Sequence, residues 1–521
     1  TQLLLYEGLT ATSQNVWPSL KWDLGALIGW LSSFLPVGFY YKTFQWPAWK
    51  WHEGLVRRLA GIAPAPTGSD PDRYDKQHAH CEVLIVGGGP TGLASALSAA
   101  HSGLRVILAD DQPELGGSLL ASDQQVDGKA ANDWVQATVH QLAELDNVTL
   151  LTRTMVVAAW DHAYFTAEQV LDEGAVAKRL WKIRAEQVIL ASGAMERPLV
   201  FPDNDRPGIM LAGAARQYLN RYAVRPGQRA VIYTNNDSAY LTALDLHLGG
   251  VRIAAVVDLR DHPQGDLPRR VRELGIAIYP GHEITATRGY FRISQLTIRP
   301  CQDESPGNSN ETRLDGNLLC VSGGWTPTLH LLSQAGGKLR YCDKRACFVP
   351  REQQPNMAGA IRPAGSANGC FNLPACLVQG HEAGLAAAAQ VCGGRPPNAM
   401  APTAAETATE YDITPHWISP RPLNGRQWVD YLHDVTSDSI DIALREGFGS
   451  VEHLKRYTTI GMAIDQGKTA NVNALGILGE RTGRSIGEVG TTTFRPPFNP
   501  VTLGALAGRE TGARLWPCLL Y

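Results

Sequence analysis

The chain has 521 residues, a hydrophobic fraction of 44% and a formal net charge of -3, and this length predicts roughly two to four domains. The small net charge, without a long run of Lys and Arg, argues against nucleic acid as a partner, and the lack of an apolar run of about 18 residues argues against a membrane span. Nine cysteines in no repeated metal-binding or disulfide spacing are typical of reduced thiols, so we expect a cytoplasmic chain without a disulfide framework.

Residues 1–75 are rich in aromatic residues and proline and show no clean strand or helix period. We expect this stretch to pack against a larger body. A membrane-interface belt is the alternative for such aromatic residues, but the apolar runs are short and are broken by Asp23, Lys42 and prolines. Residues 63–80 are polar and contain prolines, which is typical of a linker.

From residue 76 to 395, short β-branched runs alternate with amphipathic stretches. This alternation predicts an α/β fold of Rossmann type, with parallel strands joined by helices. A second Rossmann-like half is expected at about 205–320, followed by a linker at 396–424. Helical spacing over 425–490 predicts a small, mainly helical module, in which Ser437 or Asp438 is the expected N-cap of one helix.

The sharpest local pattern is a glycine fingerprint between two predicted strands, Gly87-x-Gly89-x-x-Gly92, with Asp110 at the end of the second strand. Gly87 permits a tight turn, Gly89 lets the backbone approach a pyrophosphate, and Gly92 allows close packing of a helix on a strand. The carboxylate of Asp110 stands where a ribose hydroxyl of a dinucleotide is held. The pattern therefore predicts a dinucleotide site, with a glycine-rich structural turn as the alternative.

Further stretches resemble the two-dinucleotide-binding flavoproteins: Gly116-Gly117, the run ASGAMERP from Ala191, and PAGSANG at 363–369. The resemblance implies that these stretches surround the same cofactor, and that the core is a two-dinucleotide-binding flavoprotein fold with a Rossmann-type parallel sheet. The expected cofactor-binding residues beyond the fingerprint are Pro90, Thr91, Asp111, Gly117, Ser118, Ala191, Gly193 and Gly365.

The second Rossmann-like half lacks a glycine fingerprint, because Thr234 to Ala239 follow its first strand. Side chains there obstruct the close approach of a pyrophosphate, so we expect one working dinucleotide site. This argues against a stand-alone NADH-dependent disulfide reductase. Cys342 and Cys347 have the spacing of a redox pair, but ordinary packing thiols are the favoured interpretation. His78, His80 and Cys81 lack a second ligand cluster, so we expect no metal site.

Several longer stretches resemble the α subunits of heterotetrameric sarcosine oxidases, among them LYEGLTATSQNVWPSL, GFYYKTFQWP, SVEHLKRYTTIGMAIDQGKTANVNALGIL and EVGTTTFRPPFNPVTLGALAGR. This resemblance implies a subunit of an oxidoreductase that converts sarcosine, O2 and water to glycine, formaldehyde and H2O2. It implies NAD in this chain, FMN at the boundary with a β subunit, and FAD and the N-methyl amino acid site in β. The implied partners are β, γ and δ subunits, and no catalytic residue can be named in this chain.

Related opine and hydroxyproline oxidoreductase α subunits are the nearest alternative, and a non-catalytic assembly subunit is another. Matching the motifs places the iron–sulfur cysteines of those relatives at Asp430, Leu432, Asp465 and Ala470, which excludes a cluster here. The resemblance also identifies 1–75 as the trailing part of a ferredoxin-like region with a connector, and 491–521 as the truncated entrance of an aminomethyltransferase-like folate domain. Tetrahydrofolate binding is therefore doubtful.

A phosphate site for FMN is the last expectation. Lys455, Arg456, Lys468 and Thr469 place cations and a hydroxyl beside a glycine turn, in the module that the resemblance puts near FMN. A solvated basic face is the alternative interpretation.

Overall fold

The computed structural model describes residues 7–10, 16–19, 21–27, 44, 46–59, 70–171, 174–302, 310–353, 360–393, 400–404 and 411–509. The chain divides into two compact units, Tyr74–Val501 and a smaller unit of Thr1–Arg73 with Thr502–Tyr521. Within the described ranges, no helix combines the length and apolar character needed to cross a membrane. Residues 63–69 of the expected linker at 63–80 and the tail beyond residue 509 lie outside the described residues. The linker expectation is wrong for residues 74–80, because they form the first part of the long strand β3 (Tyr74–Val86), which pairs with β10 (Lys178–Leu190).

Among the described residues of the smaller unit, the longest helix is α3 (Trp49–Leu59). The expectation that residues 1–75 have no helical period is wrong for this stretch. Glu53 and Arg57 form an i,i+4 ion pair at 3.4 Å, which supports a helix. The period is hard to see because Trp51 and Leu55 are 80% and 58% exposed, so no buried apolar stripe marks it. The unit's other described elements are β1 (Pro18–Ser19), β2 (Trp22–Asp23), η1 (Leu24–Ala26) and α15 (Leu503–Ala507).

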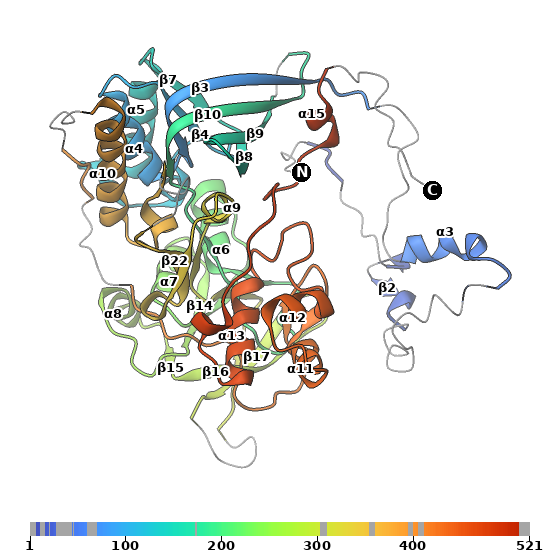
Figure 1. Cartoon of the computed structure of the whole chain (residues 1–521). Helices are drawn as coiled ribbons and strands as arrows, with labels where there is room; N and C mark the ends of the chain where they lie inside the picture. The colour runs from blue at the N-terminus through green and yellow to red at the C-terminus, as the bar shows by residue number, and fades with distance from the viewer. Residues whose placement is uncertain are drawn as a thin grey trace. The chain divides into compact units, whose positions relative to one another are not determined.

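The larger unit begins with a mixed sheet whose parallel part carries the glycine fingerprint (Figure 1). β3 pairs in parallel with β4 and β10, and β23 adds in parallel to β10, whereas β9 and β8 are antiparallel. In spatial order the strands are β7 (Val148–Leu151), β4 (Val106–Ala109), β3 (Tyr74–Val86), β10 (Lys178–Leu190), β9 (Tyr164–Val170) and β8 (Thr154–Trp160), with β23 (Ile361–Pro363) beside β10.

Two helices of this half pack unusually closely, α4 (Pro90–Ala100) and α10 (Leu373–Cys392). A Cβ at Gly380 would lie 2.3 Å from the Thr91 carbonyl oxygen, and one at Gly384 would lie 2.5 Å from that of Ser95. The Ser95 hydroxyl donates to the Gly380 carbonyl at 2.9 Å. The two glycines therefore fix how α10 lies against the helix that follows the fingerprint. Helix α5 (Ala131–Ala143) contacts α4 as well.

A second, fully parallel sheet follows, linked to the first by the paired strands β11 (Ala194–Glu196) and β20 (Trp325–Pro327). Its order is β12 (Ile209–Leu211), β19 (Leu318–Ser322), β13 (Arg229–Thr234), β14 (Arg252–Asp258) and β15 (Ile278–Pro280). Its helices are α6 (Ala212–Tyr222), α7 (Ser238–Leu248) and α8 (Asp266–Glu273), and β16 (His282–Gly289), β17 (Ile293–Pro300) and β18 (Thr312–Asp315) form an antiparallel sheet beside it. The core is thus an α/β fold of the two-dinucleotide-binding type.

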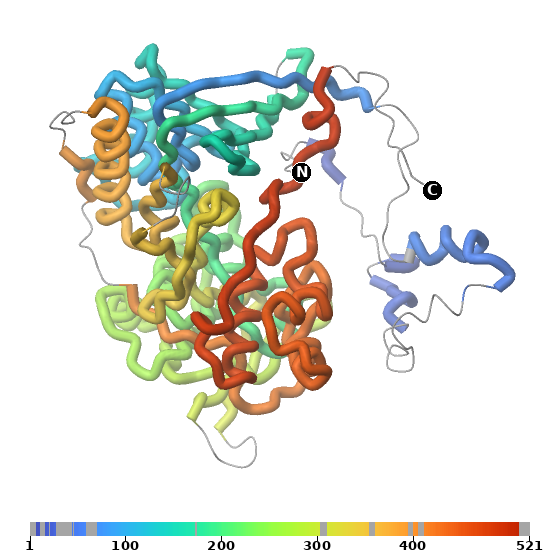
Figure 2. The backbone as a smooth tube through the Cα atoms, in the orientation of Figure 1, coloured from blue at the N-terminus to red at the C-terminus, as the bar shows by residue number. Residues whose placement is uncertain are grey.

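The last part of this unit is mainly helical, with α11 (Ser437–Arg445), α12 (Val451–Thr458), α13 (Asn471–Thr482) and α14 (Ile486–Val489) after the short pair β24 (Trp428–Asp430) and β25 (Val435–Thr436). The path of this segment can be followed in red in Figure 2. The N-cap of α11 is Thr436, not Ser437 or Asp438, because the Thr436 and Ser439 side chains form a capping box. The apolar core of this part includes Val200 and Phe348, so it packs against the nucleotide-type core.

Candidate functional site

The glycine turn after β3 is built by three glycines with different steric demands. Gly87 has φ +105°, and a Cβ there would lie 2.3 Å from the Ala191 carbonyl oxygen. A Cβ at Gly92 would lie 1.8 Å from the Gly87 carbonyl oxygen. Gly89 differs, because its Cβ would meet only the Gly117 Cα, at 3.9 Å. The fold therefore requires Gly87 and Gly92, while the space in front of Gly89 is open, as a phosphate cradle demands.

Helix α4 begins at this open space. Gly89 is its N-cap and supplies no side-chain cap, and Pro90 occupies the first helical position. The first turn therefore directs backbone N–H groups and the positive end of the helix dipole toward the space. Thr91 is buried behind this turn, where a Cβ on Gly365 would lie 2.1 Å from the Thr91 hydroxyl oxygen. Gly365 thus allows the 3-10 turn η6 (Gly365–Asn368) to close against α4.

Asp110 follows β4 directly and faces the same turn. Its carboxylate accepts from the backbone N–H of Gly88 at 2.5 Å and from that of Gln112 at 2.8 Å. Burial raises the pKa of Asp110, and these two N–H donors oppose the rise. The carboxylate therefore ties the fingerprint to the end of the second strand, the position from which a ribose is held in dinucleotide folds. Asp111 is half-buried beside it.

The other expected residues gather at the same sheet edge. Gly117 and Ser118 are exposed and begin the turn η3 (Gly117–Ala121), which approaches Gly89. Ala191 donates its N–H to the Val86 carbonyl at 2.9 Å, and Gly193, with φ +70° and open space around it, accepts from Thr328 at 3.0 Å. The residues expected around one dinucleotide, from Gly87 to Gly365, therefore lie together in the structure.

Lys468 and Thr469 lie in the turn before α13, and Lys468 is already engaged. Its ammonium donates to the Asn499 side chain and lies 4.2 Å from the centre of the Phe498 ring. Burial lowers its pKa, while the charges of Asp465 and Asp111 raise it. Asp111 thus connects this turn electrostatically with the glycine-turn site. Lys455 donates to the Thr492 hydroxyl at 3.4 Å, and Arg456 is exposed.

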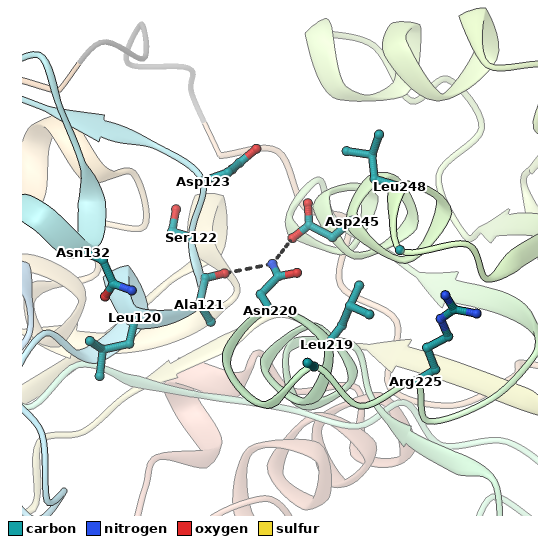
Figure 3. A pocket seen from close by; sticks show the side chains of 12 residues that line it. Leu120, Ala121, Ser122, Asp123, Asn132, Leu219, Asn220, Arg225, Asp245 and Leu248 are labelled. Carbon is teal, nitrogen blue, oxygen red and sulfur yellow. Dashed lines mark hydrogen bonds between the residues drawn. The ribbon is translucent and has the colours of Figure 1, made fainter.

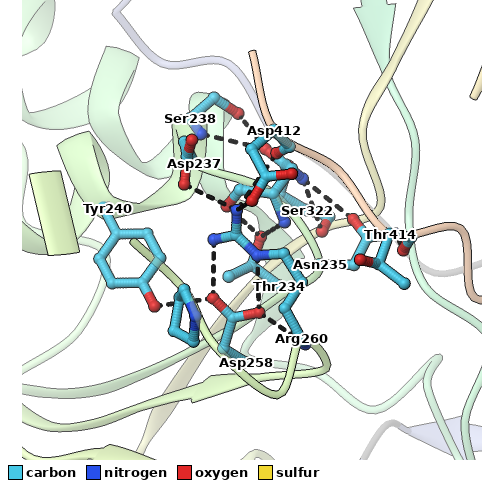
Figure 4. Close-up of polar contacts among 12 residues, drawn as sticks. Thr234, Asn235, Asp237, Ser238, Tyr240, Asp258, Arg260, Ser322, Asp412 and Thr414 are labelled. Carbon is cyan, nitrogen blue, oxygen red and sulfur yellow. Dashed lines mark hydrogen bonds and ion pairs between the residues drawn. The ribbon is translucent and has the colours of Figure 1, made fainter. Parts of the chain in front are cut away.

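In the second Rossmann-like half, a later segment of the chain covers the turn that corresponds to the glycine fingerprint, and Figure 4 shows the polar contacts that hold it there. Residues 411–414 run along the turn that follows β13, where Asn236 and Ile413 form an isolated antiparallel β-bridge. The Asn235 side chain donates to the Thr414 carbonyl at 2.9 Å, and the Thr414 N–H donates back to the Asn235 carbonyl at 3.1 Å. A protein segment therefore lies on the residues where a glycine-rich turn would face a pyrophosphate.

The acid of this second half is also occupied. Asp258 ends β14, as Asp110 follows β4, but its carboxylate accepts from Arg260 at 2.8 and 3.1 Å and from the Tyr240 hydroxyl at 2.7 Å. Arg260, only 4% exposed, also donates to Asp237 at 2.7 Å and to Asp412 at 2.8 Å. Both Asp258 carboxylate oxygens therefore already accept hydrogen bonds, so neither is free to accept one from a ribose hydroxyl. The same Arg260 holds Asp412 beside the turn that follows β13.

A cavity of about 530 Å³ opens between η3 and helices α6 and α7 (Figure 3). Its polar groups already interact: the Asn220 side chain donates to the Asp245 carboxylate at 2.6 Å and to the Ala121 carbonyl at 2.9 Å, and Asp245 also pairs with Arg216. We assign it no ligand, because the buried Asp245 carboxylate is already bonded to Arg216 and Asn220.

Of the four positions that motif matching aligns with iron–sulfur cysteines of opine and hydroxyproline oxidoreductase α subunits, Asp430, Asp465 and Ala470 support the local fold here. Asp430 is buried and accepts from the N–H groups of Leu432 and His433 at 3.0 and 3.2 Å and from that of Gly461 at 2.7 Å. Asp465 caps the N–H of Gly467 at 3.1 Å, and Ala470 is buried. Backbone N–H groups of two loops thus donate to the Asp430 carboxylate, which joins the loop after β24 to the loop at Gly461.

Sequence reasoning missed Glu196, a buried carboxyl at the end of β11. It accepts from the Gly213 N–H at 2.7 Å, at the start of α6. Burial raises its pKa to about 7, against the lowering effect of hydrogen bonds from Ser322 and Gly213. Glu196 lies within the run ASGAMERP, but that run does not reveal that its side chain is buried against Gly213 and Ser322.

Comparisons with known proteins agree with this geometry. The family model for pyridine nucleotide-disulphide oxidoreductases matches residues 81–345, and that for the sarcosine oxidase A3 domain matches residues 424–509. Sarcosine oxidase subunit alpha of Rhizobium meliloti (strain 1021) is 42% identical over 98% of this chain and 51% of its own length. Sarcosine oxidase subunit alpha of Corynebacterium sp. (strain P-1) is 40% identical over 88% of this chain and 48% of the relative's own length.

The chain therefore spans about half the length of the curated relatives it matches. Among solved structures, L-proline dehydrogenase from P. horikoshii superposes with a TM-score of 0.62 at 21% identity, covering 83% of this chain and 81% of that one. That likeness shows the same fold.

Proposed function

The chain belongs to the pyridine nucleotide-disulphide oxidoreductase family and is related to sarcosine oxidase α subunits over 98% of its length, and we propose that it is the dinucleotide-binding part of an amine oxidoreductase α subunit. The reaction proposed for the assembled enzyme is the oxidative demethylation of sarcosine, with O2 and water, to glycine, formaldehyde and H2O2. A similar N-methyl amino acid would give its own demethylated amino acid in place of glycine. In this proposal the amine binds in a β partner.

The observation that carries the proposal is the open space at Gly89 beside the start of α4. A nicotinamide dinucleotide fits this cradle, because backbone N–H groups can hold its pyrophosphate and Asp110 favours an unphosphorylated ribose. The residues proposed to line it are Gly87, Gly89, Pro90, Thr91, Gly92, Asp110, Asp111, Gly117, Ser118, Ala191, Gly193 and Gly365.

We propose that this NAD is a structural cofactor. When bound, NAD supplies a ring that can accept hydride, but a two-site reductase needs a second nucleotide to exchange electrons with the first. Here residues 411–414 and the Arg260 network occupy the second crevice. The bound dinucleotide then stabilises the fold on which partner subunits assemble.

We further propose FMN at the boundary with β, FAD within β, and γ and δ as additional subunits. Support for an anion site in this chain comes from Lys455, whose pKa is lowered by burial and by the charge of Arg495, against the raising effect of Glu452. A phosphate would offset the repulsion between these two cations. Lys468 and Thr469 remain part of this proposal, with Asn499 as the group that holds Lys468.

Co-expression with a β-like subunit, followed by purification of the complex, tests the proposal. We expect flavin absorbance bands, retained NAD and N-methylamine-dependent H2O2 formation by the complex, and no amine oxidation by this chain alone. A complex that forms without flavin or activity would instead support a non-catalytic assembly subunit. Turnover of sarcosine by the isolated chain would contradict the division of labour.

A further inference from the structure

Two cysteines that no motif singles out lie together at the junction of η6 and α10. Cys370 precedes the helix, and Cys376 lies in its first turn. The Cys376 sulfur lies 3.2 Å from the Cys370 carbonyl oxygen and within hydrogen-bonding reach of the Cys370 sulfur, so its single proton can be donated to either of these atoms. Both are reduced in the structure, and they are 8% and 5% exposed. Their sulfur atoms are thus neighbours in a nearly closed site.

The two thiols have opposite acidities. The hydrogen bond from Cys376 lowers the pKa of Cys370 to about 7, helped by the Asn372 N–H and by the charge of Arg345, although burial opposes this. The pKa of Cys376 is raised, first by its bond to Cys370 and then by burial. Burial instead raises the pKa values of Cys81, Cys301 and Cys347 to about 12. At neutral pH a substantial fraction of Cys370 is therefore thiolate beside a protonated Cys376, an arrangement that favours disulfide formation.

The pair also contacts the glycine-turn site from behind. Cys376 interacts with the Ser366 hydroxyl at 3.8 Å and with the Thr91 side chain. Thr91 belongs to the first turn of α4 and touches η6 at Gly365. A change in the bonding of Cys376 therefore acts on two elements that frame the proposed dinucleotide.

We propose that Cys370 and Cys376 are a redox-active dithiol that closes to a disulfide on reaction with H2O2. The Cys370 thiolate attacks one oxygen of H2O2, the O–O bond breaks, and a sulfenic acid forms while the leaving hydroxide takes up the proton that Cys370 had released and becomes water. The Cys376 sulfur then attacks the Cys370 sulfur and displaces the second water. The dithiol loses two electrons and two protons, and one H2O2 becomes two H2O. This inference does not depend on the amine substrate.

The proposal is tested by treating the full chain with mild H2O2, digesting it under non-reducing conditions and measuring the peptide masses by mass spectrometry. We expect the segment containing both cysteines to lose about 2 Da, corresponding to two hydrogens. The loss should persist in Cys392→Ser, which removes a third thiol nearby in sequence, and disappear in Cys370→Ser and in Cys376→Ser. A segment that stays in the dithiol form, or a disulfide that survives either substitution, would overturn the proposal.

Alkylation of the untreated chain at a series of pH values gives a second test that needs no variant. The Cys370 alkylation rate should rise with a midpoint near pH 7, about two units below an ordinary thiol. Cys342 and Cys347, which face each other across the hairpin of β21 (Leu339–Cys342) and β22 (Cys347–Pro350), form the control pair. A Cys370 midpoint near pH 9, or preferential closure of the control pair by H2O2, would refute the assignment.

Discussion

Replacing Gly89 with alanine separates the nucleotide site from the fold that carries it. Gly89 has φ -73° and ψ -172°, which any residue adopts, and the added Cβ would find its nearest neighbour at 3.9 Å. The free energy of unfolding of the nucleotide-free chain should therefore change by less than about 1 kcal/mol. The same methyl group occupies the space proposed for the pyrophosphate, so binding should weaken strongly.

The expected size follows from linkage. NAD at a hundredfold excess over its Kd stabilises the wild-type chain by about 2.7 kcal/mol, whereas hundredfold weaker binding leaves only about 0.4 kcal/mol at the same concentration. Urea denaturation with and without NAD measures both values, and equilibrium dialysis measures the binding directly.

Two variants control this comparison. Gly449→Ala, where no atom lies within 4 Å of the added Cβ, should keep the full NAD effect. Gly92→Ala should lose stability even without NAD, because its Cβ would lie 1.8 Å from the Gly87 carbonyl oxygen. If Gly89→Ala keeps the wild-type response to NAD, the fingerprint is only a structural turn and the site assignment is wrong.

Three further outcomes are expected. The chain should retain NAD in preference to NADP, and Asp110→Ala should reduce that preference; equal retention of both by the wild type in equilibrium dialysis would contradict the role of the carboxylate. Arg260→Ala should lower the free energy of unfolding by about 3–5 kcal/mol, because buried carboxylates lose their cation. It should also raise the rate of amide hydrogen exchange at residues 411–414, and an unchanged rate there would show that the ion-pair network does not hold the segment. The folded-state pKa of Glu196, about 7, lies above its ordinary value of 4.5. The free energy of unfolding should therefore fall by about 3 kcal/mol as the pH rises from 4.5 to 7. Glu196→Gln should remove this fall in urea titrations at pH 5 and 8, and parallel pH profiles for the two proteins would refute this role of Glu196.

The first Rossmann half was predictable because its requirements are local. Gly87, Gly89 and Gly92 each answer a steric demand within one turn, and the strands on both sides have a clear apolar pattern. The lack of glycine after β13 likewise predicted an unsuitable second site. What occupies that crevice was not predictable, because Asn235 and Thr414 meet only after a long intervening chain has folded.

The cysteines show the same limit. Cys342 and Cys347 attract attention through their spacing, yet Cys347 is buried with a raised pKa. Cys370 and Cys376 have no recognised spacing, and their contact depends on how η6 turns into α10. Similarly, Thr436 rather than Ser437 caps α11 because the preceding strand β25 sets the backbone at the helix start.

The stoichiometry of NAD bound to the purified chain tests the central claim most directly. Equilibrium dialysis with labelled NAD should give one nucleotide per chain, held at the glycine turn, with the second crevice filled by residues 411–414. No bound NAD, or two per chain, would contradict the account.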